Sequence, residues 1–413
     1  MHKWQEMYKQ KLTIPEEATK LINDGDRIIV PLANGQPVAL VSALAQRIKR
    51  EDVKDLVYLD ALNVNCPEMT APEVVSKINQ VRFDGDNRLL AKDSLNVVMF
   101  TVSPMDKSGF FSTGTNPDYA YAITKQEPRP TILLEVNQNM PSVHGNNHLH
   151  ISEVDAVVEN TVPLYCLPEI PVSKEDEIIA GYIVEQIPDG ACLQLGIGGL
   201  PDTIGRFLSE KKDLSVHTEM LSDCFMDLYM RGVITSREKT YMPGKWLASF
   251  VLGSQELYNF VNKNPMIEIW AAEDVVDPQI ASLNNKLVSI NTAREVDLSG
   301  QCASIPEAFR QYPHTAGEAN FVEASWQSLG GKSFIAIHST YTDQDGKVQS
   351  TIVPAINHFV TVGRQDAQYI VSEYGIAYMK GRSINSRAEE LIRLAHPDFR
   401  DWLKFEFNKL LYG

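Results

Sequence analysis

A glutamate, Glu219, follows a short apolar stretch and comes soon after a cluster of glycines. The apolar stretch belongs to LSVHTEMLSDC over residues 214–224, and the glycines belong to LQLGIGGLPD over residues 193–202. The first part of 214–224 predicts a short buried strand that stops at the glutamate. A carboxylate at a strand end can cap a helix, hold a ribose or attack a substrate carbonyl, and these alternatives differ in the elements they need around them.

The glycine cluster lies where a predicted strand meets a predicted helix. Gly196, Gly198 and Gly199 let backbone N–H groups approach an anion or a planar ligand, and a helix N-terminus adds positive potential. A tight strand–helix turn that binds nothing is the alternative. A dinucleotide-binding fingerprint is disfavoured, because Pro201 occupies the position of its third glycine.

Two further motifs are weaker candidates. GGKS at 330–333 resembles the end of a phosphate-binding loop, but Trp326 occupies the position of its first glycine and the run enters a predicted strand. His144, His148 and His150 have no cysteine or acid at ligand spacing. We therefore expect hydrogen-bonded loop histidines and no metal site.

Composition limits the class of protein. The chain has 413 residues, 44% of them hydrophobic and 22% charged, which is typical of a globular protein of two domains. Its formal charge of −15 argues against nucleic acid or an anionic membrane as a partner. Five dispersed cysteines without a CxxC pair, and no signal peptide or apolar run of membrane-spanning length, predict a reduced cytoplasmic protein.

The two halves of the chain share one layout. Each has an Asp-Gly turn, a short apolar strand, a glycine-containing loop, a proline and a helical pattern, followed by a second strand, a D-x-x-G turn and a late strand. The matched segments are 22–44 with 187–208, 55–61 with 213–219, 103–112 with 293–304, and 153–160 with 366–375. This repeat predicts two related open α/β domains with mostly parallel sheets, residues 1–175 and 176–413.

The repeat also supplies an internal control. Ligands bind beyond the carboxyl ends of strands in such sheets, which places Glu219 and the glycine loop at one crevice. In the first half Ala61 falls opposite Glu219, and the plainer PLANG at 31–35 falls opposite the glycine loop. A feature needed only for folding would recur in both halves. The second half is therefore predicted to carry the functional site.

Several motifs together resemble the acetyl-CoA hydrolase/transferase family of class I coenzyme A transferases. The branch that they resemble most strongly is that of the 4-hydroxybutyrate or butyrate–acetate CoA-transferases. The similarity runs nearly end to end. The segments that carry it are VSPMDKSGFFSTG, EVNQNMPSVHG, LQLGIGGLPD, VHTEMLSD, INTAREVDLSGQ, SLGGKSFIAI, VSEYGIAYMKGRS and RAEELIRLAHPDFRDWL.

The resemblance implies a set of site residues. Glu219 matches the family's catalytic glutamate, and Gly317 matches a glycine whose backbone lies close to the reacting carbonyl. Lys347 is a candidate for holding a CoA phosphate, with a solvated surface lysine as the alternative. The loop that contacts coenzyme A corresponds to Gly196, Ile197, Gly198, Gly199 and Leu200.

The resemblance also implies the chemistry. Glu219 would attack an acyl-CoA, form a mixed anhydride and then a glutamyl-CoA thioester, and pass coenzyme A to a second small carboxylic acid. The resemblance implies acyl-CoA and small carboxylic acids as substrates, with no permanently bound cofactor. A homo-oligomer is expected from family members. An acyl-CoA hydrolase on the same residues and a non-catalytic acyl-CoA binder remain open as alternatives.

Two other carboxylates compete with Glu219. Glu295 also follows an apolar strand, although it equally fits a turn acid beside Asp297. Glu373 matches the family, but Glu159 lies opposite it in the first half, which favours a scaffold role for both. Glu219 is the preferred nucleophile.

The sequence departs from the family pattern near the expected site. Cys224 replaces the glycine of the usual SDG, and Val276 replaces an asparagine that could bind a substrate carboxylate. Ala316 and Asn320 replace a glycine and an aspartate of the loop that contains Gly317. These changes suggest a different acyl partner or weakened turnover.

Overall fold

The computed structural model describes residues 2–60, 62–82, 95–168, 170–304, 317–357 and 359–412. A six-stranded sheet with the order β3-β2-β1-β4-β6-β8 occupies the first part of the chain, and all its neighbouring strands are parallel. Its strands are β1 (Arg27–Ile29), β2 (Val57–Asp60), β3 (Asn79–Arg82), β4 (Val97–Val102), β6 (Thr131–Val136) and β8 (Ala156–Glu159).

An eight-stranded sheet with the order β12-β11-β10-β9-β13-β16-β20-β21 follows. Only its last pair, β20 with β21, is antiparallel. Its strands are β9 (Cys192–Leu195), β10 (Ser215–Leu221), β11 (Trp246–Val251), β12 (Ile267–Ile269), β13 (Leu287–Thr292), β16 (Lys332–Ala336), β20 (Tyr369–Ser372) and β21 (Gly375–Tyr378).

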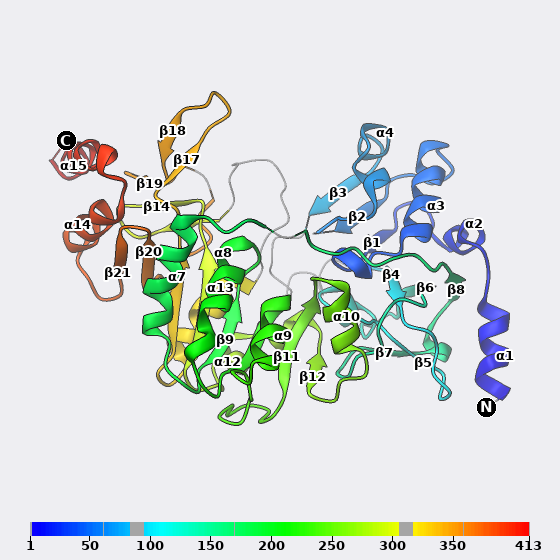
Figure 1. Cartoon of the computed structure of the whole chain (residues 1–413). Helices are drawn as coiled ribbons and strands as arrows, with labels where there is room; N and C mark the ends of the chain where they lie inside the picture. Colours follow the sequence, from blue (N-terminus) through cyan, green and yellow to red (C-terminus); the bar gives the residue numbers. More distant parts are fainter. Residues whose placement is uncertain are drawn as a thin grey trace.

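The two sheets repeat one topology, and Figure 1 shows them side by side with the chain ends at opposite extremities. In sheet order, β3-β2-β1-β4-β6-β8 corresponds to β11-β10-β9-β13-β16-β20. The predicted mixed α/β architecture with mostly parallel sheets is confirmed, as are the strand matches behind the repeat. The division at residues 175 and 176 stays a prediction.

Short accessory strands surround the large sheets. β5 (Phe110–Ser112) pairs with β7 (His148–His150), and β17 (Thr340–Thr342) pairs with β18 (Val348–Ser350). β14 (Glu295–Asp297) lies between β15 (Cys302–Ala303) and β19 (Ile352–Val353). The predicted D-x-x-G turns have matching geometry, since Oδ1 of both Asp106 and Asp297 accepts the N–H groups two and four residues later.

Helices cover the sheets and connect their strands. The α-helices are α1 (His2–Lys11), α2 (Pro15–Ala18), α3 (Val38–Lys49), α4 (Pro72–Val75), α6 (Ala120–Ile123), α7 (Lys174–Gln186), α8 (Gly199–Phe207), α9 (Asp223–Met230), α10 (Gln255–Val261), α11 (Ala272–Val275), α12 (Pro278–Ala281), α13 (Gly317–Gln327), α14 (Ile384–Leu394) and α15 (Pro397–Tyr412). Short 3-10 helices are η1 (Thr19–Leu21), η2 (Ala33–Gly35), η3 (Pro67–Thr70), η4 (Ile151–Glu153) and η5 (Leu208–Glu210). Among the helices of the described ranges, none is both long and apolar enough to cross a membrane.

The two halves share buried apolar surface. Met220, Phe250, Leu252 and Ala272 belong to the second half but pack in one core cluster with residues of the first sheet, such as Phe100. The segment between the two sheets leads into α7, where Ser173 and Asp176 form a capping box at the helix start. The packed interface fixes how the carboxyl ends of the second sheet face the first half.

Candidate active site

Glu219 lies on β10, and its side chain is 8% exposed. Parallel strands β9 and β11 flank β10, and every residue of β10 is buried. The sequence predicted a strand that stops at Glu219, but β10 continues to Leu221 because Met220 and Leu221 are also buried and pair with β11. The Ser249 hydroxyl donates a 2.9 Å hydrogen bond to the backbone carbonyl of Glu219 and holds the strand in place.

The Glu219 carboxylate receives hydrogen bonds from two distant parts of the chain. The phenol of Tyr119 donates to Oε1 at 2.5 Å, and the backbone N–H of Gly317 donates to the same carboxylate. A phenol that donates to an ionised carboxylate makes a charge-assisted hydrogen bond, which is stronger than one between neutral groups. The side chain is therefore held in one orientation by the first half of the chain on one side and by α13 on the other.

Tyr119 belongs to the first half but lies in a segment that pairs with the second. The N–H of Val251 donates to the carbonyl of Thr115, and the N–H of Ala272 donates to the carbonyl of Asp118, each at 2.9 Å. The Asp118 carboxylate in turn accepts the backbone N–H of Tyr119 at 2.7 Å. These bonds position the phenol against β10.

Burial and hydrogen bonding act in opposite directions on the ionisation of Glu219. Desolvation raises the pKa of the carboxyl above its usual value, while the Tyr119 and Gly317 donors lower it. Burial and the charge of Glu219 raise the pKa of the Tyr119 phenol, which keeps it protonated as a donor. Within the described residues no lysine or arginine forms an ion pair with Glu219. The carboxylate is thus desolvated and aimed without being neutralised by a cation.

The glycine loop and Glu219 meet at one edge of the second sheet, as the sequence predicted. β9 and β10 pair in parallel with Val216 opposite Leu193. Extending this register by three residues places Gly196 beside Glu219. The carboxyl ends of parallel strands form the ligand crevice in such sheets.

The loop itself leaves backbone amides accessible. Gly198 has φ +126°, and a side-chain carbon there would meet no atom of the described residues within 4 Å. α8 starts directly after it, at Gly199, without a side-chain cap, while Leu200 turns inward and Ile197 stays exposed. An open backbone at a helix start suits a polar or anionic group of a ligand.

Gly317 is the first described residue of α13, and the position of the Glu219 carboxylate requires that it has no side chain. A carbon added at Gly317 would lie 2.9 Å from Cδ of Glu219 and closer still to Oε2. The structure therefore brings together Glu219, Gly317 and the glycine loop.

Lys347 lies in the hairpin formed by β17 and β18, and its side chain is exposed. Its N–H donates to Oδ1 of Asp343, and its carbonyl accepts the N–H of Asp343. The backbone of Lys347 thus closes a turn of the same D-x-x-G kind. Its proposed role toward a CoA phosphate stays a prediction.

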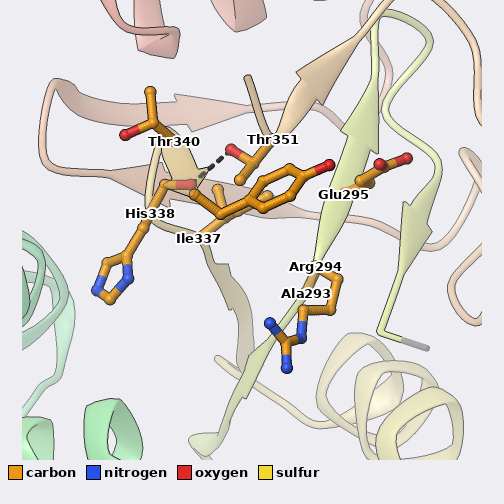
Figure 2. A pocket seen from close by; sticks show the side chains of 8 residues that line it. Ala293, Arg294, Glu295, Ile337, His338, Thr340 and Thr351 are labelled. Carbon is orange, nitrogen blue, oxygen red and sulfur yellow. Dashed lines mark hydrogen bonds between the residues drawn. The ribbon is translucent and has the colours of Figure 1, made fainter. Parts of the chain in front are cut away.

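Glu295, the competing carboxylate, lines a cavity of about 170 Å³ beyond the carboxyl ends of β13 and β16. In Figure 2 the side chains of Arg294 and His338 extend on one side of this cavity, and the Glu295 carboxylate lies apart from them. His338 is held by a 2.8 Å contact between Nε2 and Oδ1 of Asp176. The remaining lining residues are Ala293, Ile337, Thr340, Tyr341 and Thr351.

Glu373 has a scaffold contact of the kind the repeat suggested. Its carboxylate accepts hydrogen bonds from the backbone N–H and the hydroxyl of Ser339, just beyond β16. Glu159, its counterpart at the end of β8, accepts a 2.6 Å hydrogen bond from the Tyr8 phenol. Both carboxylates tie a neighbouring segment to the last parallel strand of a sheet.

The departures from the family pattern lie in different surroundings. Cys224 is buried between α8 and α9, and a carbon added at Gly205 would lie 2.8 Å from its Sγ, so the sulfur fits because Gly205 has no side chain. Val276 is buried in an apolar cluster with Phe321. Asn320 is half-buried on α13, and Ala316, like Ala61, lies outside the described residues.

The weaker motifs take structural positions. The GGKS run leads into β16, with Lys332 Nζ donating to the carbonyl of Gln186. The His144 carbonyl accepts the N–H of Ile269, and the His150 ring packs edge-on against Trp4. In the part of the chain that is described, no group of three His, Cys, Asp or Glu side chains could hold a metal ion.

Sequence reasoning missed Tyr119. Its hydrogen bond to Glu219 joins residues 100 positions apart, so no local spacing indicates it. The one available signal is the run of polar residues Thr113, Thr115, Asn116 and Asp118 around it, all of which are buried. Buried polar runs of this kind mark segments whose hydrogen-bond partners lie elsewhere in the fold.

Two repeated parallel sheets, with a buried carboxylate at the carboxyl edge of the second, define a two-lobed class of α/β proteins that build a site between their halves. The sequence profile of the acetyl-CoA hydrolase/transferase N-terminal domain matches residues 1–64 and 70–166. The profile of the C-terminal domain matches residues 253–407. The chain belongs to this acetyl-CoA hydrolase/transferase family.

Two relatives and one solved structure are similar to this chain over almost the whole length of both proteins. The chain is 37% identical to succinyl-CoA:cyclohexane-1-carboxylate CoA transferase of Geobacter metallireducens, covering 96% of this chain and 95% of that protein. It is 35% identical to 4-hydroxybutyrate coenzyme A transferase of Clostridium kluyveri, covering 98% and 99%. The crystal structure of RipA from Yersinia pestis superposes with a TM-score of 0.92 at 36% identity, covering 99% of both chains.

Proposed function

We propose that this protein is an acyl-CoA:carboxylate CoA-transferase with Glu219 as its nucleophile. The observation that carries the proposal is the Glu219 carboxylate itself, which is buried at the carboxyl edge of β10, held by two hydrogen-bond donors and beside the glycine loop. The CoA-transferases among the relatives support the same reaction class.

The proposed reaction exchanges one thioester for another. A Glu219 oxygen attacks the acyl-CoA carbonyl, the C–S bond breaks, and coenzyme A leaves as a thiolate from a mixed anhydride. The thiolate then attacks Cδ of Glu219, and the donor acid leaves with the bridging oxygen, which produces a glutamyl-CoA thioester. An acceptor carboxylate reverses both steps. Because thioester is exchanged for thioester, little driving force is needed.

The surroundings of Glu219 suit this sequence of steps. Gly317 N–H and the amides of Gly198 and Gly199 are the proposed donors for oxyanions formed during the attacks, and losing one such donor costs about 3 kcal/mol of barrier. The low exposure of Glu219 supports transfer over hydrolysis, since water would cleave a glutamyl thioester.

Coenzyme A would extend from Glu219 along the carboxyl edge of the second sheet. The glycine loop, from Gly196 to Leu200, follows β9 and borders the start of this path. The cavity beside Arg294 and His338 lies beyond β13 and β16, the next two strands after β9 in sheet order. Arg294 offers a cation for a phosphate there, and Lys347 remains a candidate on the adjoining hairpin. The proposal includes no permanently bound cofactor, a homo-oligomeric assembly and a cytoplasmic location.

Steady-state kinetics test the proposal. With an acyl-CoA and a small carboxylic acid as paired substrates, we expect parallel double-reciprocal lines, because the first acid leaves before the second binds. Release of free thiol without an acceptor acid at the same rate would identify a hydrolase instead. Tight acyl-CoA binding without either reaction would identify a binding protein and contradict the transferase.

A further inference from the structure

The phenol of Tyr119 contacts the proposed nucleophile directly. This phenol bonds to Oε1 of Glu219, while Oε2 of the same carboxylate lies against Gly317. The two oxygens of the nucleophile are therefore distinguished by their neighbours before any substrate enters.

The two oxygens also have different fates in the proposed reaction. The attacking oxygen becomes the bridge of the anhydride, and its bond to Cδ breaks when the thiolate attacks. The other oxygen remains on Cδ throughout, first as a carbonyl and then as the oxyanion of each tetrahedral intermediate at Cδ. A fixed donor to this second oxygen would stabilise every such intermediate.

We infer that Tyr119 is a catalytic residue that keeps Oε1 as the retained oxygen, directs Oε2 to attack, and donates to the oxyanion formed at Cδ. This inference rests on the proposed function and assigns part of the site to the first half of the chain. The phenol itself loses no proton, and each bond formed at Cδ is matched by one broken, to the acid or to coenzyme A.

The surroundings of Tyr119 support a fixed donor. The side chain is 6% exposed, so water does not compete strongly for the phenol. Asp118 anchors the backbone, since its carboxylate accepts the N–H groups of Leu32 at 2.8 Å and Tyr119 at 2.7 Å. A donor that is already oriented needs no reorganisation as charge develops.

The test compares Tyr119→Phe with Tyr121→Phe. Tyr121 is also buried on the same short segment, but its phenol donates to the His148 carbonyl at 2.9 Å and does not contact Glu219. We expect Tyr119→Phe to lower kcat by about 10²-fold while KM for acyl-CoA changes by less than about twofold. Tyr121→Phe should keep the wild-type kcat.

A pH profile separates this role from a structural one. Because the phenol lowers the pKa of Glu219, its loss should move the acidic limb of the rate profile of Tyr119→Phe to higher pH. Tyr121→Phe should show no such movement. If Tyr119→Phe does not fold, 3-fluorotyrosine at residue 119 keeps the shape but donates more strongly, and it should move the limb to lower pH.

Three results would overturn the inference. They are a near-native kcat in Tyr119→Phe, an unmoved acidic limb in either residue-119 variant, and an equal loss of kcat in Tyr121→Phe. Failure of the proposed function is a different result, because the wild-type protein would then transfer no coenzyme A in the paired-substrate assay.

Discussion

The two equivalent helices α3 and α8 begin in opposite ways. Each follows the first strand of its sheet, β1 or β9. The backbone N–H groups in the first turn of α3 already have a partner, because the buried Glu135 carboxylate accepts those of Ala39 and Leu40 at 2.8 and 3.1 Å. At α8, no described side chain accepts the amides of the first turn, and no described atom would lie within 4 Å of a side-chain carbon at Gly198.

This difference indicates that the two halves of the duplicated fold have different roles. The first half occupies the start of α3 with a carboxylate from β6. Among the described residues the second half has no such carboxylate at α8, and it places Glu219 on the neighbouring strand. The first half then contributes Tyr119 to that crevice. In the proposed account, one copy therefore works as a support and the other carries the candidate site.

Replacing Glu219 should change the reaction rate, whereas replacing Glu135 should change the stability of the fold. Glu219→Ala is expected to lower CoA transfer by about 10⁴-fold or more, because the covalent nucleophile is lost. Glu135→Gln should leave the rate per folded molecule unchanged and reduce the free energy of unfolding by about 1–3 kcal/mol. Initial rates and chemical denaturation check both. Glu295→Ala is the further control, and an equal loss there would make Glu295 the nucleophile.

The second prediction concerns crowding at the carboxylate. Gly317→Ala should lower kcat by about 10²-fold, because the added carbon displaces Glu219 from its aim. Gly181 is a matched control, since it also lies in a helix, but a carbon added there would meet no described atom outside its own helix within 4 Å. Gly181→Ala should leave kcat unchanged and add about 0.5–1 kcal/mol of stability. A Gly317→Ala enzyme with native kcat would show that the carboxylate does not need that space.

The third prediction concerns the open helix start. Gly198→Ala should raise KM for acyl-CoA by about tenfold, the equivalent of one lost hydrogen bond. Gly232 also has a positive φ and open surroundings, but it lies outside the glycine loop. Gly232→Ala should cost about 1 kcal/mol of stability with native kinetics. Equal KM values in the two variants would assign the glycine loop to a turn that binds nothing.

The smallest effect is the pH dependence of the wild-type rate. Attack requires an ionised Glu219, and desolvation raises the pKa of this carboxyl above 4.5. The rate should therefore fall as pH drops through a value above 4.5 and recover at higher pH. An acidic limb below 4.5 would mean that Glu219 is not held in the desolvated state described above.

The repeated segments and Glu219 were predictable from sequence because local patterns carry them. Strand, glycine loop and helix start follow each other within 187–208, and a mismatch with the first half marks Glu219 as additional. The Tyr119 contact was not predictable, because it forms only when the two halves pack together. The fit of Cys224 against Gly205 likewise depends on how α8 and α9 approach, which residue types alone do not specify.

The most direct measurement is mass spectrometry of the Glu219 peptide after incubation with acyl-CoA and reduction by borohydride. A glutamyl thioester is reduced to an alcohol, so this account predicts that the mass change falls on Glu219 and is absent when Glu219→Ala replaces the wild type. A reduced residue elsewhere, or turnover of coenzyme A with an unmodified Glu219 peptide, would contradict it.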